Sequence, residues 1–200
     1  MTAPERRERV LAAALRRFAE VGYDAASMNA IAAAAGITKP VLYDYFPSKQ
    51  ELFAAVLEGI RDDLLARGAA VSSRHASREQ RFRFAIEAFF RFADEHPQAM
   101  RVLLLVPQTS ATAAMLSKKV QAGASAGIAS FLRLLCRPME PRRLDAAAEF
   151  LKAGLHALAE WRIDGRPATR EDVVELVMQM VWQGLGASGK ARRGRRREQG

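Results

Sequence analysis

The sequence has very little of several features that define other classes of protein. It has one cysteine, Cys136, so no intrachain disulfide can form and a disulfide-stapled scaffold is excluded. The longest strictly aliphatic run, from Val102 to Val106, is far shorter than the roughly 18 residues of a membrane-spanning helix. The N-terminus lacks the apolar segment of a secretory signal peptide. We therefore expect no membrane partner and a reducing, cytoplasmic setting.

Patterns of catalytic and metal-binding residues are also missing. We find no phosphate-binding loop, no nucleophile–base set and no metal motif, so we expect no enzyme activity, no cofactor and no metal. His156, with Glu160 four residues later and Glu149 seven residues earlier, is the nearest exception. Because this spacing matches no helical metal motif, a polar group in a pocket or a hydrogen bond at an interface is the better interpretation.

What the sequence does have is an excess of positive charge. The net charge is +9, and half of the residues are hydrophobic, as in a globular protein with a core. More than half of the excess lies in residues 189–200, which hold six Lys or Arg residues and one Glu. Such a distribution suggests a nucleic-acid partner. The tail alone would raise affinity for any DNA sequence without adding specificity.

Helical patterns run along the chain as far as residue 185. Strong helix formers are abundant and strand-type alternation is nearly absent, which predicts an all-α protein of about nine helices. Gly22 marks the end of the first helix, and Ser27, Thr38 and Ser48 are at positions that cap the next three. We expect helices near residues 4–21, 28–34, 39–46, 49–70, 78–95, 97–107, 111–136, 142–161 and 170–185.

The first predicted helices have the spacing of a DNA-binding motif. Two short helices joined by a turn containing Gly36, with a long helix after them, are typical of a helix-turn-helix. Its second helix has to reach base edges in the major groove. We therefore expect a helix-turn-helix DNA-binding domain over 1–48, a helical effector-binding and dimerisation domain over 49–188, and a basic, disordered tail over 189–200.

The stretch from Arg6 to Glu58 resembles the DNA-binding domain of TetR-family transcriptional regulators. The resemblance lies in a first helix ending in FAEVGY, then IA...AGIT, then LY..F..K.ELF. It implies a homodimer in which Lys39, Pro40 and Tyr43 contact bases. Ser27, Thr38, Tyr45 and Lys49 would contact phosphates, and Asn29 could reach an adenine. Two residues depart from the family pattern. Asp44 is at a position where an aromatic or basic residue is common, and Ala30 is at a position where an acidic residue is common.

The last two helices carry apolar stripes at +3/+4 spacing, and the final helix carries a second, adjacent stripe. Two stripes on one helix suggest packing on both sides, as in a bundle formed between chains. The resemblance likewise implies a four-helix interface between two subunits. The candidate interface residues are Leu151, Leu155, Leu158, Val174, Met178, Val181 and Leu185.

The phenylalanine-rich helix near residues 78–95 suggests an apolar effector pocket, which the resemblance also implies. For any one of these residues, a filled core is the simpler alternative. The candidate lining residues are Leu64, Arg67, Phe89, Met100, Leu104, Met115, Phe131, His156 and Trp161.

These observations together predict a ligand-responsive transcriptional regulator. We expect a homodimeric repressor that binds double-stranded DNA at a palindromic operator and is released by a small, hydrophobic effector. The alternative is an architectural DNA-binding protein with little sequence preference, driven by the basic tail. The two differ in whether deletion of residues 189–200 abolishes DNA binding.

Overall fold

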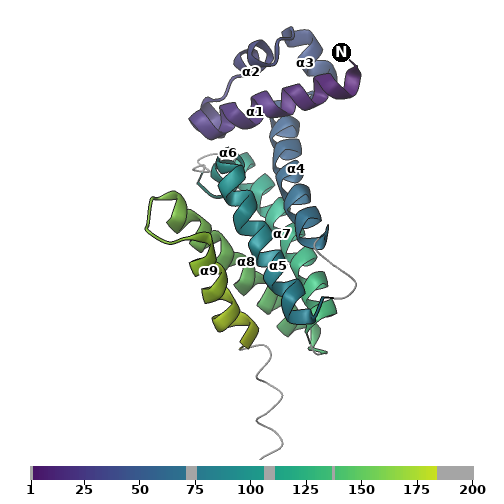
Figure 1. Ribbon diagram of the computed structural model, residues 1–200. Coiled ribbons are helices and arrows are strands. Elements are labelled where there is room, and N and C mark those ends of the chain that lie inside the picture. The colour runs from purple at the N-terminus through teal and green to yellow at the C-terminus, as the bar shows by residue number, and fades with distance from the viewer. Residues whose placement is uncertain (1, 71–75, 106–110, 137, 184–200) are drawn as a thin grey trace, which may run out of the picture. The chain divides into compact units, whose positions relative to one another are not determined.

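The computed structural model describes residues 2–70, 76–105, 111–136 and 138–183, and within these ranges it is helical with no strand (Figure 1). This confirms the all-α prediction. No helix in the described ranges has the length and apolar character needed to cross a bilayer. The elements are α1 (Ala3–Ala25), α2 (Met28–Ala35), α3 (Lys39–Tyr45), α4 (Lys49–Ala70), α5 (Arg78–Glu95), α6 (Pro97–Met100), η1 (Arg101–Leu105), α7 (Ala111–Leu135), α8 (Pro141–Ile163), α9 (Arg170–Val177) and η2 (Met178–Trp182).

The helix ends follow the capping residues of the sequence with two exceptions, at Gly22 and at Thr38. Gly22 has a φ of 77° and interrupts α1, after which a last turn continues to Ala25. The hydroxyl of Ser27 accepts a hydrogen bond from the Ala30 N–H at 3.3 Å and so caps α2. Ser48 caps α4 by accepting from the Glu51 N–H at 3.1 Å. Thr38 precedes α3 as expected, but its side chain makes no capping hydrogen bond.

Two compact units make up the chain. Unit 1 comprises residues 1–64 and 93–124, and unit 2 comprises residues 65–92 and 125–200. These divisions differ from the domain boundaries that we predicted, because the long helices α4 and α7 each contribute to both units. The predicted tail, residues 189–200, lies outside the described residues.

Unit 1 has its core beneath α1, α2 and α3. Apolar side chains at +3/+4 spacing along α1 face inward and pack against small residues of α2, which lets the two helices approach closely. An aromatic cluster closes one end of this core, with the rings of Phe18 and Tyr23 each 4.9 Å from the ring of Phe53 on α4. The fully buried side chains here include Val10, Phe18, Ile31, Leu42, Leu52 and Phe53.

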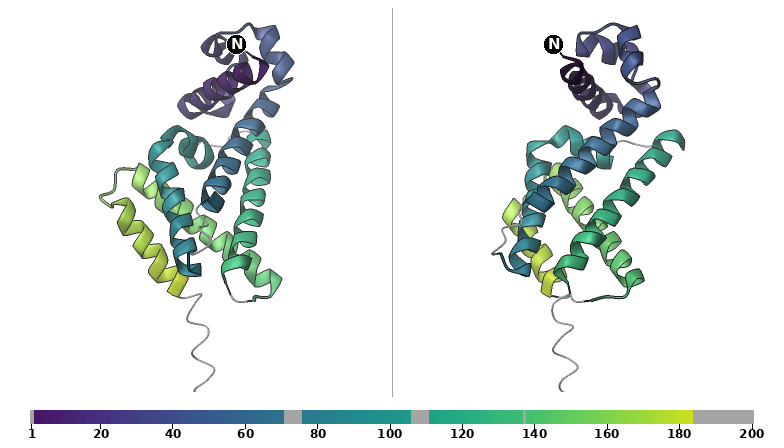
Figure 2. Two further views of the ribbon diagram at one scale, coloured as in Figure 1. Left: turned by 45° about the vertical axis from the view of Figure 1, so that its right-hand side comes forward. Right: turned by 90° about the vertical axis from the view of Figure 1, so that its right-hand side faces the viewer.

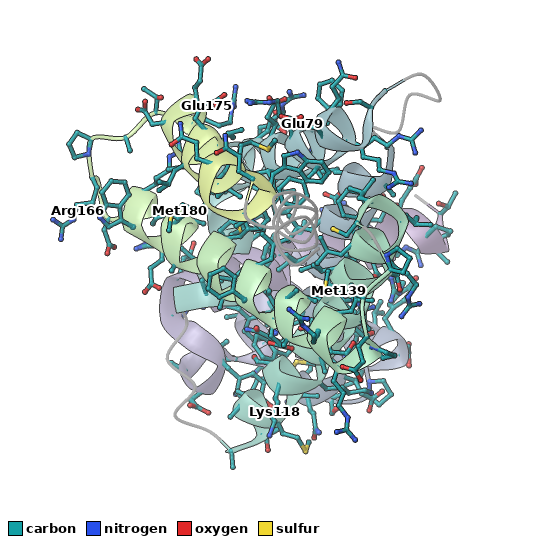
Figure 3. All side chains as sticks on the ribbon, turned by 90° about the horizontal axis from the view of Figure 1, so that it is seen from below. Glu79, Lys118, Met139, Arg166, Glu175 and Met180 are labelled. Atoms are coloured by element: carbon teal, nitrogen blue, oxygen red, sulfur yellow. The ribbon has the colours of Figure 1, made fainter. Side chains whose placement is uncertain are left out.

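Unit 2 contains most of α5, the second half of α7, and α8 and α9. In two views α9 runs beside α5 and α8 (Figures 1 and 2). A bidentate ion pair between Arg83 of α5 and Glu175 of α9 ties these helices together, with a second contact at 3.3 Å; Glu175 is labelled in Figure 3. The rings of Phe82 and Trp182 stack 5.3 Å apart. These contacts hold α9 and η2 on the apolar face of α5.

Helices α4 and α7 approach each other closely at two glycines. In unit 1, a β-carbon at Gly123 would lie 3.1 Å from the guanidinium of Arg61. In unit 2, a β-carbon at Gly127 would lie 2.8 Å from a methyl group of Leu65. By contrast, a β-carbon at Gly68 on α4 would meet nothing within 4 Å. The two glycines of α7 therefore leave room for the α4 side chains.

Candidate nucleic-acid interface

The turn between α2 and α3 depends on Gly36. This residue has a left-handed backbone with a φ of 68°, which glycine adopts without strain. Its N–H donates to the Ala33 carbonyl at 3.1 Å, and the next N–H, of Ile37, donates to the Ala32 carbonyl at 3.0 Å. A β-carbon here would also lie 2.9 Å from the guanidinium of Arg9. Gly36 therefore sets the angle between the two helices. Because it has no side chain, it also leaves room for the Arg9 guanidinium of α1 beside the turn.

One face of α3 is buried and the other is exposed. Leu42 is fully buried, whereas Lys39, Pro40 and Tyr43 are exposed. The ammonium of Lys39 lies 5.8 Å from the centre of the Tyr43 ring, so the two side chains share a face one turn apart. The three predicted base-contacting residues thus form one outward row with a positive charge, a rigid ring and a phenolic hydroxyl. Asp44 is exposed beside them.

The residues predicted to flank this row are placed in different ways. Asn29 on α2 and Thr38 before α3 are exposed, and Tyr45 is half-buried. The Ser27 hydroxyl accepts the capping hydrogen bond from α2 but keeps its own proton for donation. DNA contact by each of these residues remains a prediction from the resemblance.

Lys49 lies in an arrangement that the sequence did not predict. Its ammonium donates to the backbone carbonyls of Tyr23 at 3.0 Å, Asp24 at 3.1 Å and Ala26 at 3.2 Å. It also lies 4.6 Å from the centre of the Tyr23 ring. An ammonium has three N–H donors, and all three are used here. In this structure Lys49 therefore binds the end of α1 and fixes the start of α4 against it, and its predicted phosphate contact stays a prediction.

The predicted pocket residues fall into both units. Leu64, Met100, Leu104 and Met115 belong to unit 1, and the other five belong to unit 2. Met115 and Trp161 are exposed, which is not the placement expected of pocket-lining side chains, because each lies on an outward face of its helix. In unit 2 the Phe89 and His156 rings stack 6.2 Å apart. Arg67 instead packs its guanidinium over the Phe92 ring, at 5.3 Å.

A polar cluster in unit 2 includes a residue that sequence reasoning missed. Lys152, only 9% exposed, donates to the Ser125 hydroxyl at 2.7 Å and pairs with Glu149 at 2.7 Å. Hydrogen bonds from Lys152 and from Ser125 hold the pKa of Glu149 below its ordinary value. Burial, aided by the Lys152 charge, lowers the pKa of His156 to about 4, so its imidazole is neutral at pH 7. A signal existed, since Lys152 follows Ala148 by four residues within the apolar stripe of α8.

The apolar stripe that we predicted as the subunit interface is largely buried within the chain. Leu151, Leu155, Val174 and Met178 are buried, Leu158 and Val181 are half-buried, and Leu185 lies outside the described residues. The most regular stripe of each helix packs into its own core, which leaves the four buried residues little surface for a partner; their role as interface contacts stays a prediction. The exposed large apolar side chains of α8, α9 and η2 are Phe150, Trp161, Leu176 and Met180.

Comparisons with known proteins agree with this architecture. Residues 10–56 match the family model of bacterial regulatory proteins of the tetR family. The transcriptional activator FasR of Mycolicibacterium smegmatis is 34% identical over 188 residues, which cover 90% of this chain and 83% of that protein. The nucleoid occlusion factor SlmA of Haemophilus influenzae is 31% identical over 103 residues, which cover 51% of this chain and 47% of that protein.

Solved structures show the same similarity in three dimensions. A tetR-family transcriptional regulator from Streptomyces coelicolor has a TM-score of 0.69 and 30% identity, covering 94% of this chain and 83% of that one. A TetR-like regulator from Rhodococcus sp. RHA1 has a TM-score of 0.72 and 28% identity, covering 93% and 98%. With the helix-turn-helix, the exposed row on α3 and a relative that matches nearly the whole chain, this protein belongs to the TetR family of bacterial transcriptional regulators.

Proposed function

We propose that this regulator is a homodimeric repressor that acts in the cytoplasm, binds a palindromic operator and is released by a small hydrophobic effector. The observation that carries the DNA-binding part is the outward row of Lys39, Pro40 and Tyr43 on α3. A side chain at the start of a recognition helix reaches base edges, and a tyrosine ring can contact a thymine methyl group. Asn29 and Thr38, both exposed, extend this surface to a further base and a phosphate.

A second copy of this chain is the partner that best explains the exposed apolar residues of α8, α9 and η2. Phe150 and Met180 are each 69% exposed, and Trp161 and Leu176 accompany them on the same elements. Between Phe150 and Trp161 lie two small, exposed residues, Gly154 and Ala157, at +4 and +3 spacing. Small residues between two large ones let a partner helix approach closely. We therefore place the dimer interface on these outward faces of α8 and α9 rather than on the buried stripe.

Support for a hydrophobic effector comes from the buried apolar side chains of unit 2 and from one solved structure of the same fold. FadR from Bacillus subtilis, solved in complex with stearoyl-CoA, has a TM-score of 0.69 at 17% identity. Helix α4 is continuous from the Lys49 contact in unit 1 to residues 65–70 of unit 2. An effector that displaces α4 would alter operator binding, and a coupling free energy of about 1–3 kcal/mol corresponds to a 5–150-fold loss of affinity.

Two other candidates rest on specific relatives. FasR is an activator, so activation by this chain is the second candidate for the direction of regulation. SlmA is named as a nucleoid occlusion factor and not as a transcriptional regulator, so we keep the architectural alternative, in which the tail drives binding with little sequence preference. The relatives are DNA-binding regulators, and we propose no enzyme activity.

Selection from a random duplex library tests these candidates. The full chain and a chain ending at residue 188 are compared at about 150 mM salt, where the Debye length is roughly 8 Å and weak attraction by the tail is screened. Enrichment of an inverted repeat by both supports the dimeric, sequence-reading regulator. Binding that lacks sequence preference and requires the tail supports the architectural alternative. Transcription in vitro from a template carrying the selected site then separates repression from activation.

A further inference from the structure

Lys152 is the one charged residue that the structure buries within the described ranges. Its neighbours on the inward face of α8, Ala148, Leu151 and Leu155, are apolar and buried. Removing an ammonium from water is costly, and an uncharged side chain of similar volume fills such a position without that cost. Packing alone therefore does not account for a lysine at this position.

The counter-ion of Lys152 comes from a side chain that is mainly exposed. Glu149 is one helical turn earlier on α8, its side chain is 57% exposed, and its carboxylate lies 2.7 Å from the ammonium. The Ser125 hydroxyl of α7 accepts a second hydrogen bond at 2.7 Å. This mainly exposed carboxylate can rotate into water at the cost of its hydrogen bonds from Lys152 and Ser125, whereas the buried ammonium cannot follow it. Lys152 is thus left able to exchange one anion for another.

The surroundings of Lys152 combine a neutral hydrogen-bonding group with an aromatic surface. His156 lies one turn further along α8 and stacks on the Phe89 ring of α5, with an angle of 14° between the planes. Because the imidazole is neutral at pH 7, it offers one donor and one acceptor. Phe89 also contacts Phe90 edge to face, at 5.2 Å between ring centres. A buried cation, a neutral imidazole and aromatic rings together suit a ligand with an anionic head and an apolar body.

We propose that Lys152, Ser125 and His156 bind the anionic head, a carboxylate or a phosphate, of an amphipathic effector. Glu149 occupies the place of that head when the effector is absent. This assignment rests on the proposed ligand-responsive function and adds to it the chemical class of the ligand. An effector of this class displaces the Glu149 carboxylate into water, and its apolar body lies toward Phe89.

Calorimetric titration of the full chain with decanoate, decyl phosphate and decan-1-ol tests the proposal. A hydrogen-bonded ion pair with Lys152 is expected to make at least one of the two anions bind about tenfold more tightly than the alcohol. Lys152→Met, which preserves the volume of the side chain, is expected to reduce that preference to about twofold or less. Glu149→Gln removes the competing carboxylate and is expected to strengthen anion binding several-fold. Lys119→Met, at an exposed position of α7, serves as the matched control.

Several results would overturn the proposal: no binding of any of the three compounds, equal binding of anions and alcohol, or a preference that survives in Lys152→Met with unchanged circular dichroism. The relative affinities of decanoate and decyl phosphate identify the head group. Measurements of operator binding distinguish failure of the proposed anion site from failure of the proposed ligand-responsive function. If decanoate binds through Lys152 but leaves operator affinity unchanged, the site stands and the ligand response fails. If another effector releases the operator without any preference for anions, the response stands and the site fails.

Discussion

Replacement of Lys49 by methionine is expected to destabilise unit 1 while leaving the electrostatic part of DNA binding intact. In the structure the Lys49 ammonium joins the start of α4 to three carbonyls at the end of α1, those of Tyr23, Asp24 and the C-cap Ala26. Methionine has a similar length and removes only the charged donor. The variant therefore separates the role seen in the structure from the phosphate contact that the resemblance implies.

The magnitude follows from the contacts that are lost. A hydrogen bond to a charged group contributes about 1.5–3 kcal/mol, but the three acceptor carbonyls share one ammonium and some can be rehydrated. The contact with the Tyr23 ring adds about 0.5–1 kcal/mol. We expect a loss of about 2–4 kcal/mol in the free energy of unfolding. Urea denaturation followed by circular dichroism measures it, with Lys39→Met, at an exposed position, as the control.

The salt dependence of operator binding provides the opposing test. The slope of log K against log salt is negative and grows steeper with each neutralised phosphate. If Lys49 neutralised a phosphate in each subunit, Lys49→Met would make that slope shallower by about 2 per dimer. We expect no change in that slope for Lys49→Met at a temperature where the variant is folded. For Lys39→Met we expect the slope to become shallower by about 2. Unchanged stability together with a reduced slope for Lys49→Met would refute the structural role.

Three further predictions concern unit 2. Because the folded-state pKa of His156 is lowered to about 4, protonation below pH 6.5 favours the unfolded state. Between pH 7 and pH 5 this group should remove about 2 kcal/mol of the free energy of unfolding, and His156→Phe should lack that loss. Parallel profiles of stability against pH for the original chain and His156→Phe would contradict this prediction. Gly127→Ala places a methyl group against Leu65 and should be about 1–2 kcal/mol less stable than Gly68→Ala, in urea denaturation. Equal stabilities would show that Leu65 moves aside freely. Phe150→Glu should shift the sedimenting species from dimer to monomer, and an unchanged dimer would place the interface elsewhere.

Local features of unit 1 were predictable because their signals lie within a few residues of one another. Ser27, Gly36 and Ser48 act through hydrogen bonds to residues three positions away, so the sequence alone locates the caps and the turn. The exposed row on α3 follows from helical periodicity once Leu42 is assigned to the core. The family resemblance depends on this same stretch.

The sequence was least informative where function depends on contacts between distant segments. The sequence shows that α8 and α9 have apolar stripes, but which stripe enters the core depends on the helices packed against them, and the structure buries Leu151 and Val174. Lys49 is 23 to 26 residues from its acceptors, so nothing near it in the sequence reveals that its donors are used.

The sequence by itself therefore determined the helical class, the position of the helix-turn-helix and the row of side chains that faces outward on α3. These properties depend on periodicity and on capping, which act over one or two helical turns. Only the tertiary structure decided that Lys49 binds backbone, that Lys152 is buried beside His156, and which faces of α8 and α9 remain exposed. A side chain's hydrogen-bond partners and its exposure depend on the helices that fold against it, and these come from distant parts of the chain.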